Sequence, residues 1–288
     1  TTGTVTLNAA TNAANLTGAA AILADSFTGV TSHTGTITVS DSATTAVTAS
    51  DLVIIGGATT GTVTVTNALA ISGSAAQLEA ALMTTATLVA AASSTVTITG
   101  STAASVAQLK GINDATTGAV TLNAATIAAN LTGAAADLAD GFTGITSHTG
   151  NLTINGSVAA TLGDLKIIND ATAGTVTLNA ATIAANLTSS AAILADGFTG
   201  VTSHTGNLTI NGSTAATVGD LKIINDATAG TVTLNAATIA ANLTGAAAVI
   251  ADGFTGVTTH TGNLTINGSV AATVGDLKII NDATAGTV

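Results

Sequence analysis

The feature that most constrains this chain is a tandem repeat. The phrase NDAT occurs four times, each time 56 residues after the one before, at Asn113, Asn169, Asn225 and Asn281. Repeats of this size bury their apolar faces against their neighbours rather than in one large common core. The sequence therefore predicts an array built by stacking, and such arrays more often supply length and surface than chemistry.

Equivalent glycines divide the 288 residues into five repeats and the beginning of a sixth. The predicted repeats are 1–60 and 61–117, which are divergent, then 118–173, 174–229 and 230–285, with 286–288 opening the sixth. Because no linker interrupts them, we expect one continuous solenoid. The chain begins at Thr1 without an initiator Met or a signal peptide and stops partway into a copy, so we expect a piece of something longer.

The first half of each repeat contains an expected strand and an expected helix. The alternation in TVTLN (175–179) predicts the strand, and AAADLADGF (134–142) predicts the helix, as does SAAQLEAALM, with Ser74 as its N-cap. We interpret the intervening AATIAANLTG as an extended turn, because its counterpart in the second repeat, ALAISG, has a strand-like pattern.

The second half repeats this order. NLTING (207–212) predicts a strand that carries Leu208 and Ile210 on one face. Ser213 is expected to cap a second helix, AATVGDLKII, whose apolar residues recur at helical spacing.

The two halves, from Gly174 to Gly206 and from Gly206 to Gly230, are 32 and 24 residues long. These lengths lie close to those of a strand-plus-helix solenoid coil. We therefore predict a right-handed α/β solenoid, in which short parallel strands stack into a sheet and short helices or turns cover it. An all-β solenoid is the alternative, because threonine and valine favour strands.

The charge balance limits the partners. The chain has four Lys, no Arg and fifteen acidic residues, for a formal net charge of −11, and such a surface repels nucleic acid and anionic lipid. The mean hydropathy is +0.61, but no apolar run approaches the ~20 residues of a membrane-spanning helix. We expect neither nucleic-acid binding nor membrane insertion. Cysteine is absent, so there is no disulfide framework.

A histidine stands in the loop motif SHTG or THTG of four repeats, at His33, His148, His204 and His260. A stack of imidazoles would suit a metal ladder or a pH switch. The second repeat has Ala92 at this place, however, and neither cysteine nor carboxylate keeps step with the histidines. We therefore predict loop histidines without a metal.

The lysines recur with aspartates at fixed spacing. Lys166, Lys222 and Lys278 each follow an aspartate by two residues (Asp164, Asp220, Asp276) and precede another by four (Asp170, Asp226, Asp282). Val53 fills the lysine position in the first repeat, which argues against a catalytic amine. We predict surface ion pairs between residues i and i+4, each worth a few tenths of a kcal/mol.

Asparagine and phenylalanine have expected structural roles. Asn123, Asn179 and Asn235 follow the first strand and are predicted to form an asparagine ladder, with each amide bonding the next coil at a buried bend. The phenylalanines are expected to be apolar plugs at helix ends, with Met83 as their counterpart in the second repeat: Phe27, Phe142, Phe198 and Phe254.

N-x-S/T sequons, which a composition rich in Asn, Thr and Ser also generates by chance, formally allow N-glycosylation at Asn15, Asn130, Asn151, Asn155, Asn186, Asn207, Asn211, Asn242, Asn263 and Asn267.

Enzymatic motifs do not stand out. No Ser/His/Asp triad, phosphate-binding loop or close carboxylate pair repeats, so we predict that the chain is not an enzyme and has no catalytic, cofactor-binding or metal residues. Acidic secreted repeat proteins often fold on calcium, but the aspartates here are spread singly, as in LADG and GDLK. We therefore expect no cofactor, with occasional bound calcium as the alternative.

The phrases TGTVTLN, GSAAQLEAAL, TAASVAQLKGINDATTGAVTL and NLTINGS resemble the repeats of giant extracellular and cell-surface proteins of cyanobacteria and other aquatic bacteria. The resemblance covers the whole chain and lies in composition and rhythm. It implies a secreted, acidic, cysteine-free repeat region that acts as a stalk, sheath, surface layer or fibre. It carries over no functional residues.

These observations favour a structural protein that self-associates, with the ends of neighbouring molecules stacking as if the array continued. The alternative is an adhesin segment that binds ice, a glycan or a cell surface. It rests on strands such as TVTVT (62–66), which resemble the flat threonine faces of ice-binding solenoids, although later repeats offer only one such Thr-x-Thr pair each. A third interpretation is a passive spacer that projects another domain.

Overall fold

The computed structural model describes residues 5–84 and 89–288, so the first four residues of the predicted repeat 1–60 and residues 85–88 of the predicted repeat 61–117 lie outside the described part. The chain forms two compact units. Unit 1 comprises residues 1–131 and 140–150, and unit 2 comprises residues 132–139 and 151–288. The division falls inside the predicted repeat 118–173.

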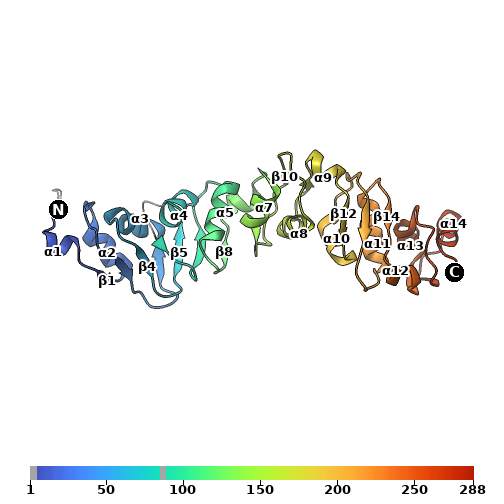
Figure 1. Cartoon of the computed structure of the whole chain (residues 1–288), viewed down its shortest axis with the longest axis horizontal. Helices are drawn as coiled ribbons and strands as arrows, with labels where there is room; N and C mark the ends of the chain where they lie inside the picture. Colours follow the sequence, from blue (N-terminus) through green and yellow to red (C-terminus); the bar gives the residue numbers. More distant parts are fainter. Residues whose placement is uncertain (1–4, 85–88) are drawn as a thin grey trace. The chain divides into compact units, whose positions relative to one another are not determined.

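Short strands alternate with short helices through unit 1 (Figure 1). The helices described in unit 1 are α1 (Ala9–Asn12), α2 (Ala20–Phe27), α3 (Ala49–Ala58), α4 (Ala75–Leu82), α5 (Val106–Asp114) and α6 (Ala124–Ala128). The strands described there are β1 (Leu16–Gly18), β2 (Ile37–Val39), β3 (Ala46–Thr48), β4 (Val63–Val65), β5 (Ala70–Gly73), β6 (Val89–Ala90), β7 (Thr95–Ile98) and β8 (Val120–Thr121). Strand β9 (Leu131–Gly133) and helix α7 (Ala135–Phe142) draw residues from both units.

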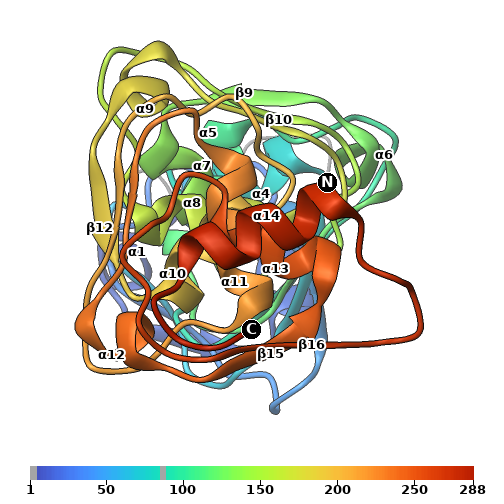
Figure 2. The ribbon, with the colours of Figure 1, turned by 90° about the vertical axis from the view of Figure 1, so that its right-hand side faces the viewer.

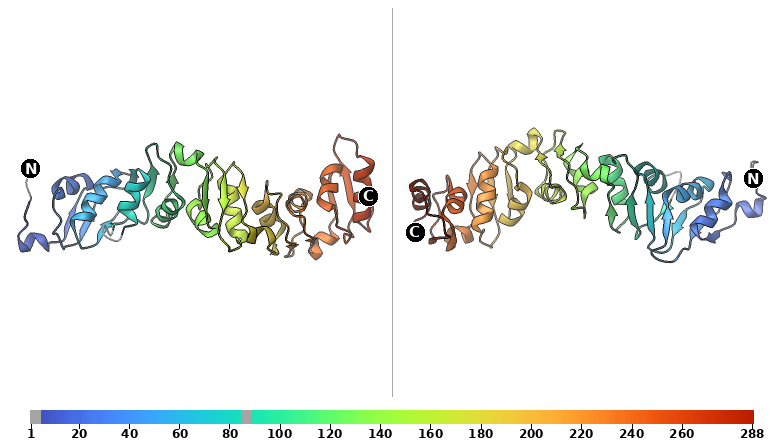
Figure 3. Two further views of the ribbon diagram at one scale, coloured as in Figure 1. Left: turned by 90° about the horizontal axis from the view of Figure 1, so that it is seen from above. Right: turned by 180° about the vertical axis from the view of Figure 1, so that it is seen from behind.

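Unit 2 alternates in the same way, as both views of Figure 3 show. Its helices are α8 (Leu162–Ala171), α9 (Ala180–Ala184), α10 (Ala191–Phe198), α11 (Val218–Ala227), α12 (Ala236–Ala240), α13 (Ala247–Phe254) and α14 (Val274–Ala283). Its strands are β10 (Leu152–Ile154), β11 (Val176–Thr177), β12 (Leu187–Ser189), β13 (Leu208–Ile210), β14 (Val232–Thr233), β15 (Leu243–Ala246) and β16 (Leu264–Asn267).

The strands form several small sheets. In the described residues, unit 1 has the orders β1-β2-β4-β6 and β3-β5-β7-β8, unit 2 has β12-β13-β14 and β15-β16, and a further sheet has the order β11-β10-β9. The described registers are all parallel. The prediction of short parallel strands that alternate with helices is therefore confirmed, and the all-β alternative is wrong.

The register explains how these strands are held. Leu187 pairs with Leu208, which pairs with Val232, so apolar residues stack while the threonines beside them point outward. Leu208 and Ile210 are both buried, as predicted. The strands β11 and β14 are short, because the helices α9 and α12 follow them directly along the chain. These two helices lie at different corners of the view in Figure 2.

The segment AATIAANLTG is not an extended turn, and this prediction was wrong. It forms a five-residue helix, α9 or its counterpart, followed by a separate strand such as β12. The cause is the preceding Asn179, whose side-chain oxygen accepts a hydrogen bond from the backbone N–H of Thr182 and caps the helix. The same cap shortens the strand expected at 175–179 to Val176–Thr177.

The second helix of each repeat begins later than predicted. Ser213 does not cap it. Thr217 does, in a capping box with Asp220, and the helix α11 starts at Val218. Ala216, just before this cap, donates its backbone N–H to the Thr238 hydroxyl of the next repeat, which holds the segment in a loop. The helices α4, which Ser74 caps, and α7 lie where the sequence places them.

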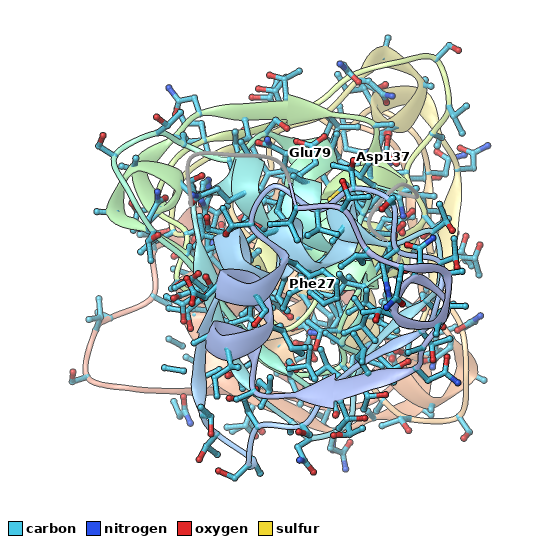
Figure 4. The ribbon with its side chains drawn as sticks, turned by 90° about the vertical axis from the view of Figure 1, so that its left-hand side faces the viewer. Phe27, Glu79 and Asp137 are labelled. Carbon is cyan, nitrogen blue, oxygen red and sulfur yellow. The ribbon has the colours of Figure 1, made fainter. Side chains whose placement is uncertain are left out.

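The core is made of small aliphatic side chains and one large plug in most repeats. Phe142, Phe198 and Phe254 are among the largest fully buried side chains, and Phe27, labelled in Figure 4, is also buried. The prediction that Met83 takes the place of phenylalanine in the second repeat was wrong. Counted from the N-caps, Leu82 takes the place of phenylalanine, and the half-buried Met83 reaches over Gly111.

Candidate interaction surface

Three buried asparagines join each repeat to the segment before it. The Asn179 amide group donates to the carbonyl oxygens of Asn155, Gly156 and Val158 at 3.1, 3.1 and 2.8 Å. Asn123 and Asn235 make the same set of bonds. The prediction was right that these amides bond neighbouring backbone at a buried bend. These amides do not bond one another, because successive asparagines are 56 residues apart. The prediction of an asparagine ladder was therefore wrong.

A different set of asparagines forms a ladder of side-chain to backbone bonds. The Asn186 side-chain oxygen accepts from the backbone N–H of Asn207 at 2.8 Å, 21 residues later, and that of Asn207 accepts from Thr231 at 3.0 Å, 24 residues later. Both asparagines belong to sequons, and both are exposed. The signal for this ladder is an asparagine directly before the strand motif LTI or LTS.

Three lysines, Lys110, Lys166 and Lys222, each bridge two helices. We call the group around Lys222 the lysine clamp: Lys222, Asp226, Asp252 and Asn225. The Lys222 ammonium lies 2.7 Å from the Asp226 carboxylate in α11 and 2.6 Å from the Asp252 carboxylate in α13. Asn225 donates to the Asp252 carbonyl oxygen at 2.6 Å. The predicted pair between i and i+4 is confirmed, and the bond to the next helix was missed.

The same clamp recurs at Lys166 in the repeat 118–173 and at Lys110 near the end of the divergent repeat 61–117. Lys166 joins Asp170 to Asp196, and Lys110 joins Asp114 to Asp140. The hydrogen bonds that these ammonium groups donate to the partner carboxylates, with Asp226 first and Asp252 second at Lys222, raise the pKa of each lysine. Because these groups are substantially exposed, each ion pair contributes little to stability.

Between the first and second repeats, all four residues of the lysine clamp are replaced together. Where α3 packs on α4, Val53 stands in place of lysine, Gly56 and Gly57 in place of Asn225 and Asp226, and Ala80 in place of Asp252. The aspartates two residues before the lysines have another role, since Asp164, Asp220 and Asp276 complete capping boxes. Glu79, labelled in Figure 4, accepts instead from Gln108 in α5 at 2.8 Å.

The loop histidines are buried against the phenylalanine plugs. The ring centroids of His204 and Phe198 lie 4.9 Å apart, and the other three pairs are alike. The sequence predicted the loop but missed the burial. The backbone of His204 accepts from Ala229, and that of Ala92 accepts from Thr117, which confirms the two positions as equivalent. In the second repeat, Leu82 therefore replaces the phenylalanine and Ala92 replaces the histidine, so both members of the pair change together.

Burial lowers the pKa of His148, His204 and His260. The backbone carbonyls of Thr182 and Ala185 beside His204 oppose this shift in part, although neither ring nitrogen forms a hydrogen bond of good geometry. The imidazoles are therefore held neutral in the folded chain at pH values where an unfolded chain would bind protons.

We expect the free energy of unfolding to fall as the pH is lowered below about 6.5, the usual histidine pKa. The folded-state pKa is depressed, so the unfolded chain binds more protons and gains stability as the pH falls. The slope is at most about 1.4 kcal/mol per pH unit for each histidine. Urea titrations between pH 7.5 and 5 measure it. A variant with His148→Leu, His204→Leu and His260→Leu should lose most of the slope, and an unchanged slope would assign it to other groups.

Hollows recur beside the helix N-termini. The largest of one corresponding set is ≈ 340 Å³, and alanines make up four of its ten lining residues, which also include Thr161 and Asp164. In the described residues, no three His, Cys, Asp or Glu side chains gather closely enough to hold a metal ion. The helices of the described part are also too short or too polar to cross a membrane.

Comparison of the chain with protein-family models, with curated proteins and with solved structures gives no match in any of the three.

Proposed function

We propose that this chain is a structural repeat protein, an α/β solenoid that forms or extends a filament, sheath, stalk or surface layer at the cell exterior. The observation that carries the proposal is that two kinds of contact between half-repeats recur, the amide bonds of Asn123, Asn179 and Asn235 and the lysine clamps of Lys110, Lys166 and Lys222. The Asn179 type of bond reaches back 21 to 24 residues, and the lysine clamp reaches forward 27 to 30 residues.

In this arrangement the recurrent polar groups form their hydrogen bonds and ion pairs with the neighbouring repeat rather than with a ligand. Asn123, Asn179 and Asn235 have their amide hydrogens on backbone carbonyls, and the lysines of α5, α8 and α11 have theirs on aspartates. An exterior location is supported by the acidic, cysteine-free composition and by the resemblance of the repeats to those of giant bacterial surface proteins.

Self-association of the purified chain tests the proposal. We expect concentrated material to form linear assemblies in electron micrographs, because repeat faces that are not covered expose apolar surface and sheet edges. A chain that remains monomeric at high concentration, with no linear assemblies, would contradict the stacking function.

The adhesin alternative is supported by one observation, an outward row of hydroxyls on each sheet. Thr17, Thr38 and Thr64 are adjacent in register, as are Thr188, Thr209 and Thr233. Each described row is only a few residues long. Thermal hysteresis or binding on a glycan array would favour this alternative, and silence in both would favour the structural one.

A further inference from the structure

The strands β10 and β13 each lead into an Asn-Gly turn. Asn155 and Asn211 directly follow these strands. The glycines after them, Gly156 and Gly212, have φ values of +83° and +85°, which residues with a side chain rarely adopt. The equivalent Asn267 is itself the last residue of β16, so the asparagine backbone at this position is extended.

The two turns are open to water, and their asparagine side chains are not tied down. In the described residues, no hydrogen bond of the Asn155 or Asn211 side chain is found, whereas the Asn207 side chain accepts from Thr231. A Cβ built on the glycine of either turn would meet nothing within 4 Å. The hollow of ≈ 340 Å³ is lined in part by Asn155, so solvent reaches the side-chain amide.

An exposed Asn-Gly pair can react with itself, because glycine has no side chain to block the approach. The Gly212 backbone nitrogen loses its proton and bonds to the Asn211 Cγ. The side-chain amide takes up a proton and leaves as ammonia, so the product is a cyclic succinimide. Water then opens the ring at one of its two carbonyls, which gives either aspartate or isoaspartate, whose main chain runs through Cβ and Cγ. The reaction needs no reactant except water.

The buried asparagines hold these turns in a conformation that does not react. The Asn235 amide group donates to the carbonyl oxygens of Asn211 and Gly212 at 3.2 and 2.9 Å, so the peptide groups on both sides of the glycine are held. Ring closure requires the extended Asn211 backbone to rotate about its Cα–C bond, which brings the glycine nitrogen beside Cγ. The same rotation turns the Asn211 carbonyl away from the Asn235 amide and breaks their hydrogen bond.

We propose that Asn155 and Asn211 are sites of spontaneous succinimide and isoaspartate formation, and that the amides of Asn179 and Asn235 restrain the reaction. The product in turn weakens the contact between half-repeats. Isoaspartate adds one methylene group to the main chain within a segment that presents three carbonyl oxygens to a single amide, so the three bonds are no longer formed together. This inference concerns the lifetime of the contact within one chain and does not depend on self-association.

The second repeat contains a matched turn without the reactive side chain. Thr99 and Gly100 take the places of the Asn-Gly pair, and Gly100 has a φ of +86°. The Asn123 amide binds their carbonyl oxygens at 3.3 and 2.9 Å. The turn therefore needs the glycine but not the asparagine. Asn155→Thr and Asn211→Thr are expected to keep the fold and to abolish the reaction at their positions.

The experiment incubates the purified full chain at mildly alkaline pH and follows its peptides by mass spectrometry, together with the ammonia released. Isoaspartate should accumulate at Asn155 and Asn211. In urea the reaction at both should be about tenfold faster, because the amide bonds that hold the turn are lost. Equal rates with and without urea would overturn the restraint. An absence of isoaspartate at both positions, even in urea, would overturn the sites themselves.

Asn235→Ala removes the restraint from one turn only. We expect it to raise the rate at Asn211 about tenfold and to leave the rate at Asn155, which Asn179 still binds, unchanged. A rate at Asn211 that does not change would contradict the restraint. Equal acceleration at both asparagines would assign the effect to general unfolding and would also contradict it.

The effect of the product is measured by urea unfolding before and after incubation. The unaltered chain should lose stability as isoaspartate accumulates. A variant with threonine at all three Asn-Gly pairs should not: Asn155→Thr, Asn211→Thr and Asn267→Thr. If both chains lost stability equally, or if neither did while isoaspartate accumulated in the unaltered chain, the modification would not weaken the contact between half-repeats.

Discussion

Asn179→Ala is expected to lower the free energy of unfolding of unit 2 by about 3 kcal/mol. The substitution removes the N-cap of α9, worth about 1 kcal/mol. It also leaves the carbonyl oxygens of Asn155, Gly156 and Val158 without their donor in a part-buried place, which costs about 1 to 2 kcal/mol more. Urea unfolding followed by circular dichroism measures the total, and faster amide exchange in 155–182 would locate it.

Two substitutions make this expectation specific. Asn179→Asp keeps the cap acceptor but turns a carboxylate toward three carbonyl oxygens, so it should cost more than alanine at neutral pH. Asn207→Ala, in the same repeat, removes one exposed bond from the backbone of Thr231 and should cost under about 1 kcal/mol. If Asn207→Ala were as costly as Asn179→Ala, the buried amide would not be the main fastening of the half-repeats.

The sequence was sufficient for features that depend on local periodicity. Alternation in NLTING places Leu208 and Ile210 in the core, and the spacing of Val218, Leu221 and Ile224 places them on the buried face of α11. Hydrophobic periodicity alone did not predict the structure of the segment after Asn179, because there the capping side chain determines that a helix forms instead of a turn. The asparagine alone does not decide this: Asn8, Asn123, Asn179 and Asn235 each cap a short helix, whereas Asn67, directly before ALAISG, donates to the Asp41 carbonyl oxygen and the strand β5 follows.

The contacts between half-repeats could not be predicted from local sequence patterns, because they join residues that lie 20 to 30 positions apart in the chain. The pair of Lys222 and Asp226 follows from helix geometry, but the bond to Asp252 requires the placement of α13. The divergent repeats nevertheless contain evidence of these contacts, because the residues that form a contact are replaced together. Val53 and Ala80 change together, as do Leu82 and Ala92, so coordinated replacement within one chain could have identified both contacts from sequence.

Gly206→Ala is expected to destabilise unit 2 by several kcal/mol. A Cβ at this position would overlap the Ala185 carbonyl oxygen and lie 2.6 Å from the carbonyl carbon, closer than real Cβ atoms come to such a group. The backbone cannot easily withdraw, because Gly206 donates to the Ile183 carbonyl at 3.1 Å and accepts from the Thr228 hydroxyl at 2.7 Å. Relief therefore requires the separation of three chain segments, which loses their hydrogen bonds as well as their packing.

The same substitution in α11 should have the opposite sign. At Gly219 the nearest atom to a new Cβ is the Thr217 hydroxyl oxygen at 3.7 Å, an ordinary contact distance. Alanine there reduces the conformational entropy of the unfolded chain and raises helix propensity, so Gly219→Ala should stabilise by about 0.5 to 1 kcal/mol. Thermal melts of the two variants compare them directly. Equal effects would mean that the close approach at Gly206 does not constrain the stacking of half-repeats, whereas opposite effects would identify the loop glycine, rather than the helical one, as the residue that sets their spacing.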